Sequence, residues 1–259
     1  MSFENHTVLT KDNIDHYLKL VAKEYRKLSG KHTPAEIIIV GGASVVINYG
    51  FRGMTNDIDA LMNAASSMKT AINNVGDEFR LPNGWLNSDF KYTDSYSDKL
   101  YQHSSYYRTF SNIVTVRTVS GEYLVAMKLR SGRPYKNDMS DIIGILSEHE
   151  KRNTPISLEM IKSAYEELYG SWDSLPEKSR KFIQGVVSEK DYIQSYCEIR
   201  CAEKNNMKEL QQFEERYPGI LNKNNVNDII ARLHEEDGKA KPSHLNAGMI
   251  KAKKYEIDY

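Results

Sequence analysis

A pair of glycines placed directly after a short apolar run is the feature that most constrains the fold. Residues 36–40 are almost wholly apolar and rich in isoleucine, which is typical of a central strand that is buried on both faces. Gly41 and Gly42 end that strand, and residues 43–49 continue with a helical pattern. A turn without side chains lets the backbone approach a phosphate, and the start of the helix directs free N–H groups at the anion. Together with the hydroxyl of Ser44, the pattern predicts a phosphate-binding turn.

A pair of acids follows on the next predicted strand. Residues 56–62 alternate like a strand and carry Asp57 and Asp59 two positions apart. Both carboxylates of such a pair project from one face of the strand, about 7 Å apart along the backbone. Magnesium prefers carboxylate and phosphate oxygens, and two ions about 4 Å apart can clamp the attacking and leaving oxygens of a phosphoryl displacement. The sequence therefore predicts a site for Mg²⁺ or Mn²⁺ beside the phosphate-binding turn.

The remaining pattern predicts an α/β (α+β) fold with a helical C-terminal region. Up to residue 150 we expect helices over 11–28, 66–75, 123–129 and 138–149, strands over 106–110 and 113–119, and loops over 77–98. Beyond it the periodicity predicts helices over 158–169, 177–187, 192–217 and 226–233. We therefore expect one domain over 1–150 and a helical domain over 151–259, with a loosely attached basic tail from about residue 238.

Composition excludes several classes of protein. The formal net charge is zero, so the chain is no generic polyanion binder, and no DNA partner is expected. No apolar run reaches the roughly 20 residues that cross a bilayer, and the N-terminus lacks a secretory signal, so we expect a cytoplasmic protein without a membrane partner. Cys197 and Cys201 lack further ligands for zinc and are expected to be reduced thiols.

Rival catalytic signatures are missing from the sequence. No Gly-Lys-Ser/Thr follows a glycine loop, as a P-loop requires, and residues 42–46 lack the closing glycine of a nucleophile elbow. The chain also contains neither Gly-x-Gly-x-x-Gly nor His-Glu-x-x-His. The glycine turn followed by the acid pair is therefore the strongest functional pattern.

This pattern resembles the polymerase-β-like nucleotidyltransferase superfamily, in which a glycine turn and short helix precede Asp-x-Asp on the next strand. Two later segments sharpen the resemblance: residues 123–129 with Lys128, and residues 133–142 with Arg133 and Asp141. They look like the lysine and aspartate motifs of the branch that contains the toxins of type IV toxin-antitoxin and abortive-infection systems.

The resemblance implies a nucleotidyltransferase core with a mixed β-sheet flanked by helices. It implies magnesium-dependent transfer of a nucleoside monophosphate from a nucleoside triphosphate (NTP), with release of pyrophosphate. The acceptor class of such toxins is often RNA, particularly transfer RNA, and a cognate antitoxin protein is a further expected partner. The implied nucleotide-binding residues are Gly41, Gly42, Ser44, Thr55 and Arg133, the metal ligands are Asp57 and Asp59, and the further catalytic residues are Lys128, which contacts phosphate or base, and Asp141, which positions or deprotonates the acceptor.

One departure from the superfamily leaves a second hypothesis open. The superfamily commonly supplies a third carboxylate from a later strand, yet residues 113–119 contain no acid and offer Arg117 instead. Asp89, Asp138 or Asp141 can compensate, and spacing does not choose among them. The alternative is a catalytically inert relative that keeps the fold as a nucleotide-sensing or interaction module.

Two further choices also stay open at this stage. The acceptor can be RNA, a protein or a small molecule. The basic cluster of Lys128, Arg130, Arg133 and Lys136 either guides a triphosphate or RNA backbone, or forms an exposed helix rim.

Overall fold

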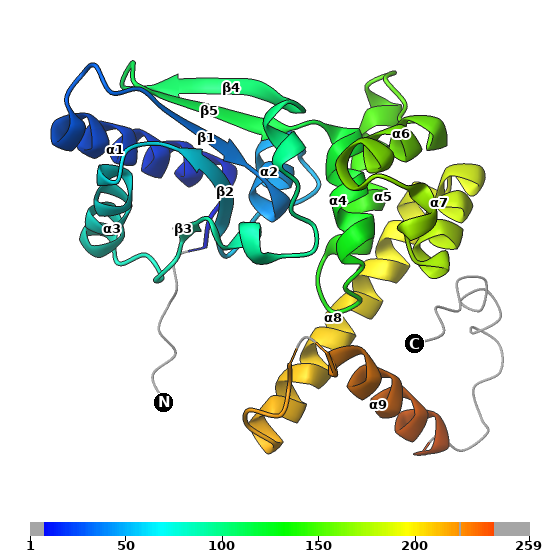
Figure 1. Cartoon of the computed structure of the whole chain (residues 1–259). Coiled ribbons are helices and arrows are strands. Elements are labelled where there is room, and N and C mark those ends of the chain that lie inside the picture. The colour runs from blue at the N-terminus through cyan, green and yellow to red at the C-terminus, as the bar shows by residue number, and fades with distance from the viewer. Residues whose placement is uncertain (1–7, 223, 241–259) are drawn as a thin grey trace.

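The computed structural model describes residues 8–222 and 224–240. Within them the chain folds into a five-stranded sheet, helices on both of its faces, and a helical C-terminal region (Figure 1). The strands are β1 (Ala35–Ile39), β2 (Ile58–Asn63), β3 (Leu86–Asn87), β4 (Ser104–Phe110) and β5 (Val114–Val119). The helices are α1 (Lys11–Ser29), α2 (Gly41–Asn48), α3 (Ser67–Phe79), α4 (Gly121–Ser131), α5 (Asp138–Lys151), α6 (Leu158–Tyr169), α7 (Glu177–Glu189), α8 (Tyr192–Arg216) and α9 (Val226–Ala240).

The sheet is mixed, as expected, and its order is β3-β2-β1-β5-β4. The central strand β1 pairs antiparallel with β2 and parallel with β5. At the end of β1 the backbone N–H of Val40 donates to the carbonyl oxygen of Asp59 at 2.9 Å. This register places the glycine turn directly beside the acid-bearing start of β2.

Alternation along β1 divides the hydrophobic core between the two faces of the sheet. Ile37 and Ile39 lie in the core cluster that contains the buried residues of α1 and α3. Ile38 and Val40 lie in the other cluster, which contains the buried residues of α4 to α7. The second cluster crosses residue 150 without a break, so the sheet and the first C-terminal helices share one core.

The elements confirm most of the predicted helices and strands, and they differ at the start of β2. The segment before it is held by the N-terminal chain, because Thr55 and Leu9 exchange two backbone hydrogen bonds of 2.8 and 3.0 Å. Thr55 is thereby drawn into a bridge of its own, and β2 begins at Ile58 and not at residue 56. Asp57 stands immediately before the strand and Asp59 within it.

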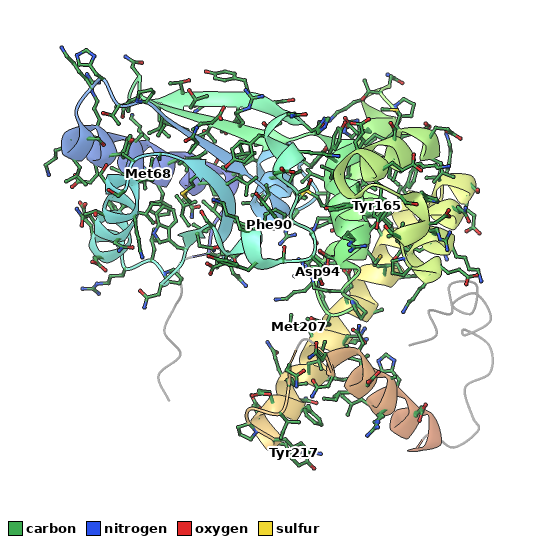
Figure 2. All side chains as sticks on the ribbon, in the orientation of Figure 1. Met68, Phe90, Asp94, Tyr165, Met207 and Tyr217 are labelled. Atoms are coloured by element: carbon green, nitrogen blue, oxygen red, sulfur yellow. The ribbon has the colours of Figure 1, made fainter. Side chains whose placement is uncertain are left out.

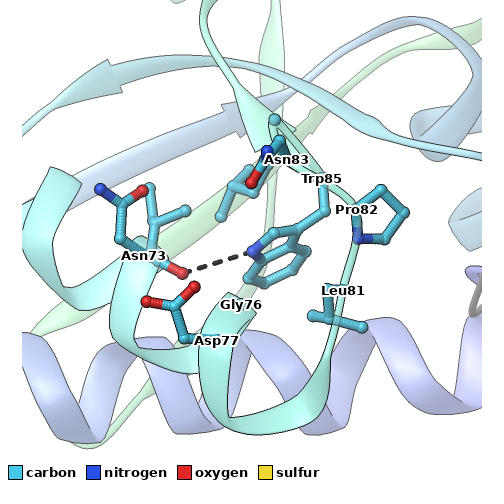
Figure 3. Close-up of a pocket in the computed structure, with 10 residues that line it drawn as sticks. Asn73, Gly76, Asp77, Leu81, Pro82, Asn83 and Trp85 are labelled. Carbon is cyan, nitrogen blue, oxygen red and sulfur yellow. Dashed lines mark hydrogen bonds between the residues drawn. The ribbon is translucent and has the colours of Figure 1, made fainter.

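The connection from α3 to β3 closes over Trp85 (Figure 3). The indole Nε1 donates to the carbonyl oxygen of Ile72 at 3.3 Å, and a Cβ at Gly76 would lie 3.0 Å from that same nitrogen. The backbone carbonyl oxygen of Trp85 accepts a hydrogen bond from the backbone N–H of Ile58 at 2.7 Å. This packing anchors β3 against β2, while most of residues 77–98 lacks regular structure, as predicted.

The C-terminal helices extend away from the sheet. α8 runs past α5, and Met207 lies in its second half (Figure 2). α9 packs against α8 at Leu210, which shares a small hydrophobic cluster with Val226 and Ile230. None of the helices in residues 8–222 and 224–240 combines the length and apolar character that a bilayer crossing requires. Of the basic tail expected from residue 238, the part from residue 241 onward lies outside the described residues.

Candidate functional site

A cleft of about 400 Å³ opens between the start of β2 and the junction of α4 with α5. Its walls come from four parts of the chain: the glycine turn, the segment into β2, the α4–α5 connection and α8. The lining residues are Gly42, Arg52, Met54, Thr55, Asn56, Asp57, Asp59, Lys128, Arg133, Lys136, Asn137, Asp138, Arg200 and Met207.

The glycine turn needs both of its glycines, for different reasons. Gly41 has φ +60°, in the left-handed region that favours glycine. At Gly42 an added Cβ would lie 2.8 Å from Nη2 of Arg52 and 3.0 Å from Oγ1 of Thr55. Because Gly42 lines the cleft at the first turn of α2, the backbone there is open to a bound anion.

Asp57 and Asp59, here called the acid pair, line the same cleft, as predicted. The pKa of Asp59 is raised to about 6, mainly by burial and next by the charge of Asp57, whereas Arg133 and a hydrogen bond from Asn87 act in the opposite direction. Within the described residues, no lysine or arginine is in ion-pair contact with either carboxylate. The acid pair is therefore a centre of negative charge that no lysine or arginine of the described residues contacts directly, although Arg133 acts on Asp59 from a greater distance.

The acid pair fits a magnesium ion that is shared with a triphosphate. Magnesium is commonly bound by one or two carboxylates together with phosphate oxygens and water, not by a cage of protein ligands. In residues 8–222 and 224–240 no three His, Cys, Asp or Glu side chains gather to hold a metal by themselves. Two carboxylates that line one cleft without an ion-pair contact from a described lysine or arginine are a donor set of the kind that would hold a divalent metal ion beside phosphate oxygens.

The three acids proposed to compensate for the missing third carboxylate differ in their surroundings. Asp89 begins the short turn η1 (Asp89–Tyr92), and its charge raises the pKa of Asp59. Asp138 and Asp141 are instead held by cations. Arg117 of β5 turns away from the cleft, since its Nε donates to Ser104 at 2.8 Å.

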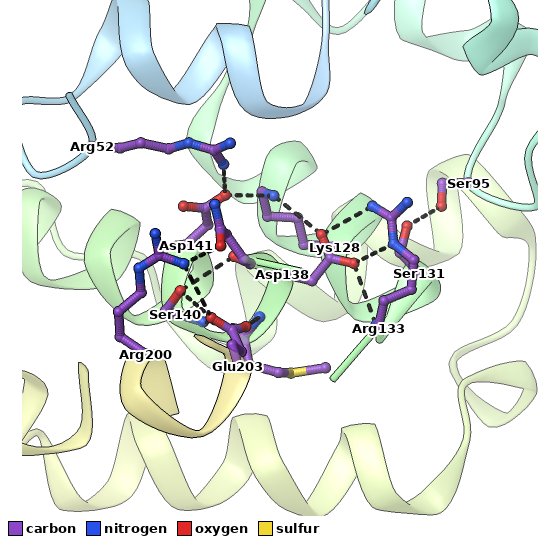
Figure 4. A network of polar contacts seen from close by, with 12 residues as sticks. Arg52, Ser95, Lys128, Ser131, Arg133, Asp138, Ser140, Asp141, Arg200 and Glu203 are labelled. Carbon is purple, nitrogen blue, oxygen red and sulfur yellow. Dashed lines mark hydrogen bonds and ion pairs between the residues drawn. The ribbon is translucent and has the colours of Figure 1, made fainter. Parts of the chain in front are cut away.

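Another part of the cleft is formed by a set of charges that is fully paired, here called the buried network: Arg52, Lys128, Arg133, Asp138 and Asp141 (Figure 4). Lys128 Nζ lies 2.7 Å from Asp141 and 3.3 Å from Asp138. Arg133 binds Asp138 through Nε at 2.8 Å and Nη2 at 3.2 Å, and Arg52 pairs with Asp141. The network spans the segment into β2, α4 and the start of α5.

Burial acts strongly on the network. Lys128 is 6% exposed and Asp138 2%. Burial raises the pKa of Asp138, but Lys128 and Arg133 more than offset it and hold that pKa below its ordinary value. Burial likewise lowers the pKa of Arg133, and Asp138 reverses the effect, so the guanidinium is held more firmly charged than usual. Asp138 and Arg133 therefore hold one another in their charged forms.

The predicted site residues are not all placed alike. Gly42, Thr55, Asp57, Asp59, Lys128 and Arg133 line the cleft, with Gly41 at the base of the turn. Ser44 is 0% exposed, and its hydroxyl accepts a long bond of 3.4 Å from Asn48. Asp141 is 2% exposed and lies behind Lys128. The structure thus brings six predicted residues to the cleft surface and leaves Ser44 and Asp141 beneath it.

The basic cluster also divides between two surroundings. Lys128, Arg133 and Lys136 line the cleft. Arg130 turns to the other side of α4, where it contacts the hydroxyl of Tyr165 at 3.2 Å and lies over the ring of Tyr169. Arg130 therefore belongs to the packing of α6 and not to the site.

Sequence reasoning missed Arg52, close to the acid pair in sequence, and two cleft residues that come from far along the chain. Arg52 lies in the loop before the acids, and its basic side chain beside the acid motif was a usable signal. Arg200 and Met207 come from α8, and no motif spacing connects them to a turn some 160 residues earlier. Only the packing of α8 against α5 brings them in.

Comparison with models of known protein families gives a match. Residues 16–180, more than half of the chain, match the model of a family described as "Nucleotidyltransferase of unknown function (DUF6036)". No curated protein and no solved structure shows a match to the chain. The matched range contains the glycine turn, the acid pair and the buried network, and it ends before α8.

Proposed function

Because the chain belongs to this family of nucleotidyltransferases of unknown function, we propose that it transfers a nucleoside monophosphate from an NTP to an acceptor, with a divalent metal ion. The observation that carries the proposal is the meeting in one cleft of the glycine turn, the acid pair, Lys128 and Arg133. Anion-binding groups lie on one side of the cleft and metal-binding carboxylates beside them. This arrangement suits a metal–triphosphate complex.

Each group has a separate task in the proposal. The backbone at Gly41 and Gly42 binds the triphosphate, together with Thr55 and Arg133. The acid pair holds Mg²⁺ or Mn²⁺, which when bound polarises the phosphate and neutralises charge on the leaving pyrophosphate. Lys128 contacts a phosphate, and Asp141 holds Lys128 and Arg52 from beneath. Ser44 supports the turn from the buried side of α2.

The transfer balances as a single displacement at phosphorus. An oxygen of the acceptor bonds to the α-phosphorus, and the bond from that phosphorus to the oxygen bridging it to the β-phosphate breaks. Pyrophosphate leaves with the electron pair of the broken bond, and the proton of the acceptor hydroxyl passes to a carboxylate of the cleft. The residues of the cleft contribute mainly by positioning the groups and by stabilising charge.

The proposed acceptor is RNA, and transfer RNA in particular. Two basic residues that line the cleft outside the buried network support it: Lys136 on the α4–α5 connection and Arg200 on α8. They add positive charge to the lining of the cleft, which suits a phosphate backbone. The resemblance to toxins of toxin-antitoxin and phage-defence systems further supports a toxin role, with a cognate antitoxin as partner.

The test is transfer of label from each of the four α-labelled triphosphates to total cellular RNA and to purified transfer RNA, in magnesium or manganese. We expect one triphosphate to label RNA, and expression of the wild-type chain to inhibit growth. Calorimetry with the same triphosphates, with and without magnesium, measures binding separately. Saturable, metal-dependent binding without transfer to any acceptor would replace the enzyme with a nucleotide-sensing module.

A further inference from the structure

One face of α8 is fastened to the segment that connects α4 to α5. Residues three apart on that face make successive contacts. Arg200 Nη1 bonds to the side-chain oxygen of Asn137, and Asn206 Nδ2 donates to the carbonyl oxygen of Pro134 at 2.9 Å. Glu203 lies between them and is 3% exposed. The helix thus holds the connection that carries Arg133 and Asp138.

Glu203 caps the N-terminus of α5 from outside that helix (Figure 4). Its Oε1 accepts the backbone N–H groups of Met139 at 2.9 Å and Ser140 at 3.2 Å. Its Oε2 accepts the hydroxyl of Ser140 at 2.5 Å. The residue that precedes α5, Asn137, makes no capping bond with its own side chain. A carboxylate from α8 therefore does for α5 what an N-cap residue ordinarily does.

The capped turn is the one that carries the acids of the buried network. Met139 and Ser140 lie between Asp138 and Asp141 in sequence, so the hydrogen bonds of Glu203 fix the backbone on which both carboxylates stand. Those carboxylates in turn hold Lys128, Arg133 and Arg52. A shift of this turn therefore displaces three cations of the cleft at once.

We propose that Glu203 is a positioning residue for triphosphate binding, acting through the first turn of α5 on the cations of the cleft. The inference rests on the proposed function for its ligand, and it extends the site to α8, beyond the residues that match the family. The position is a costly one for an acid, since burial raises the pKa of Glu203 to about 7 even though Ser140 and Met139 bond to it. Because the side chain of Asn137 does not cap α5, the role of Glu203 is to order the first turn of that helix.

The test compares three variants with a matched control. Glu203→Ala removes all three bonds. Glu203→Gln keeps an amide oxygen for the two backbone N–H groups, while the Ser140 hydroxyl reverses to accept from the amide. Ser140→Ala removes one bond. The control is Ser157→Ala, which removes the N-cap of α6, where Ser157 accepts the N–H of Met160 at 3.2 Å; Ser157 does not line the cleft.

Calorimetry with magnesium and each triphosphate gives the first readout. We expect Glu203→Ala to weaken the affinity about tenfold, Ser140→Ala about threefold, and Glu203→Gln to stay within about twofold of wild type, by analogy with the size of capping effects. Ser157→Ala should lower the thermal midpoint without changing the affinity. Should Glu203→Ala fail to fold, Ser140→Ala against Ser157→Ala decides the question.

Hydrogen exchange of the ligand-free protein separates this inference from the proposed function. Glu203→Ala should speed exchange over residues 138–141, and Ser157→Ala should not. A wild type that binds no triphosphate would end the proposed function, and the positioning of the triphosphate with it, while faster exchange would still leave Glu203 as the cap of α5. Wild-type affinity in both Glu203→Ala and Ser140→Ala would overturn the positioning role although the enzyme stands, as would unchanged exchange over residues 138–141.

Discussion

The acid pair and the buried network, two parts of the same cleft, hold their charges in opposite ways. The acid pair gathers like charges without a protein cation, and the pKa of Asp59 rises to about 6 through burial and the charge of Asp57. In the buried network Lys128, Asp138 and Asp141 are more deeply buried, yet each charge of the network has an oppositely charged partner. Two close carboxylates without a cation are unfavourable in the free protein, and a bound cation would relieve their repulsion. The charges of the buried network are instead satisfied by one another, and they hold the surrounding chain in place. The acid pair and the buried network should therefore respond differently to the same kind of substitution.

The largest effect is expected in the buried network, at Lys128. Lys128→Met leaves Asp138 and Asp141 buried without the cation they share, and breaking a buried pair in this way costs about 3–5 kcal/mol. We expect the free energy of unfolding, measured by urea denaturation, to fall by that amount. A loss below about 1 kcal/mol would mean that the network does not contribute to the fold.

Asp57 tests the acid pair by a substitution that should cost no stability. A carboxylate that holds metal against a triphosphate contributes mainly in the transition state, so Asp57→Asn should reduce transfer of labelled nucleotide at least about 100-fold. Because neutralising one of two close acids relieves repulsion, the thermal midpoint of the metal-free protein should stay level or rise. Growth inhibition by the wild-type chain should disappear. Equal labelling by the variant and the wild type would remove the acid pair from the mechanism.

The sequence predicts the glycine turn and the acid pair as one connected site, whereas for the buried network it predicts individual residues without their pairings. The reason is the range of the contacts. The glycine turn and the acid pair lie within 20 residues of each other and obey local rules for turns and strands. The network joins Arg52 to Asp141 across 89 residues, and Glu203 reaches Ser140 across 63. No periodicity encodes such pairs. The sequence also predicts that the hydroxyl of Ser44 binds phosphate, although the side chain is buried. Only the packing of α2 against the rest of the protein decides which face of that helix is buried.

Gly42 lies in the glycine turn next to Arg52 of the buried network, and its substitution can be matched with one at Gly53. A Cβ at Gly42 would lie 2.8 Å from Nη2 of Arg52, whereas at Gly53 it would meet nothing within 4 Å. Gly42→Ala should displace Arg52 and fill the mouth of the turn, which weakens triphosphate affinity about tenfold, in line with about 1–3 kcal/mol for overpacking. Gly53→Ala should leave the affinity unchanged. Equal affinities for the two variants in calorimetry would show that the turn does not contact the triphosphate.

A smaller effect is expected in the pH dependence of stability, and its sign follows from Asp59. Its pKa is about 6 in the folded protein, against about 3.9 for an unfolded aspartate. Between these values the folded protein holds a proton that the unfolded chain has lost, so stability falls as pH rises from about 4 to 6 and then stays level. With a chelator present, the thermal midpoint of wild type should decline relative to Asp59→Asn over this window. Glu203, whose pKa is also raised, is common to both proteins and cancels in the comparison. A constant difference across the window would contradict the raised pKa.

The smallest effect is expected at Ser44, where resemblance and geometry disagree. Its side chain is 0% exposed, its only hydrogen bond within the described residues is the 3.4 Å contact from Asn48, and it does not line the cleft. Ser44→Ala therefore removes a weak bond and should cost at most about 1 kcal/mol of stability, with triphosphate affinity within about twofold of wild type. Asn48→Ala removes the donor of the same bond and also the acceptor of a 3.2 Å bond from the Thr118 hydroxyl, so it should cost more stability than Ser44→Ala and likewise leave the affinity within about twofold of wild type. A tenfold loss of affinity in Ser44→Ala alone would mean that α2 rotates when the triphosphate binds and brings this hydroxyl into the cleft, so the glycine turn would be rearranged by its ligand and not preformed for it.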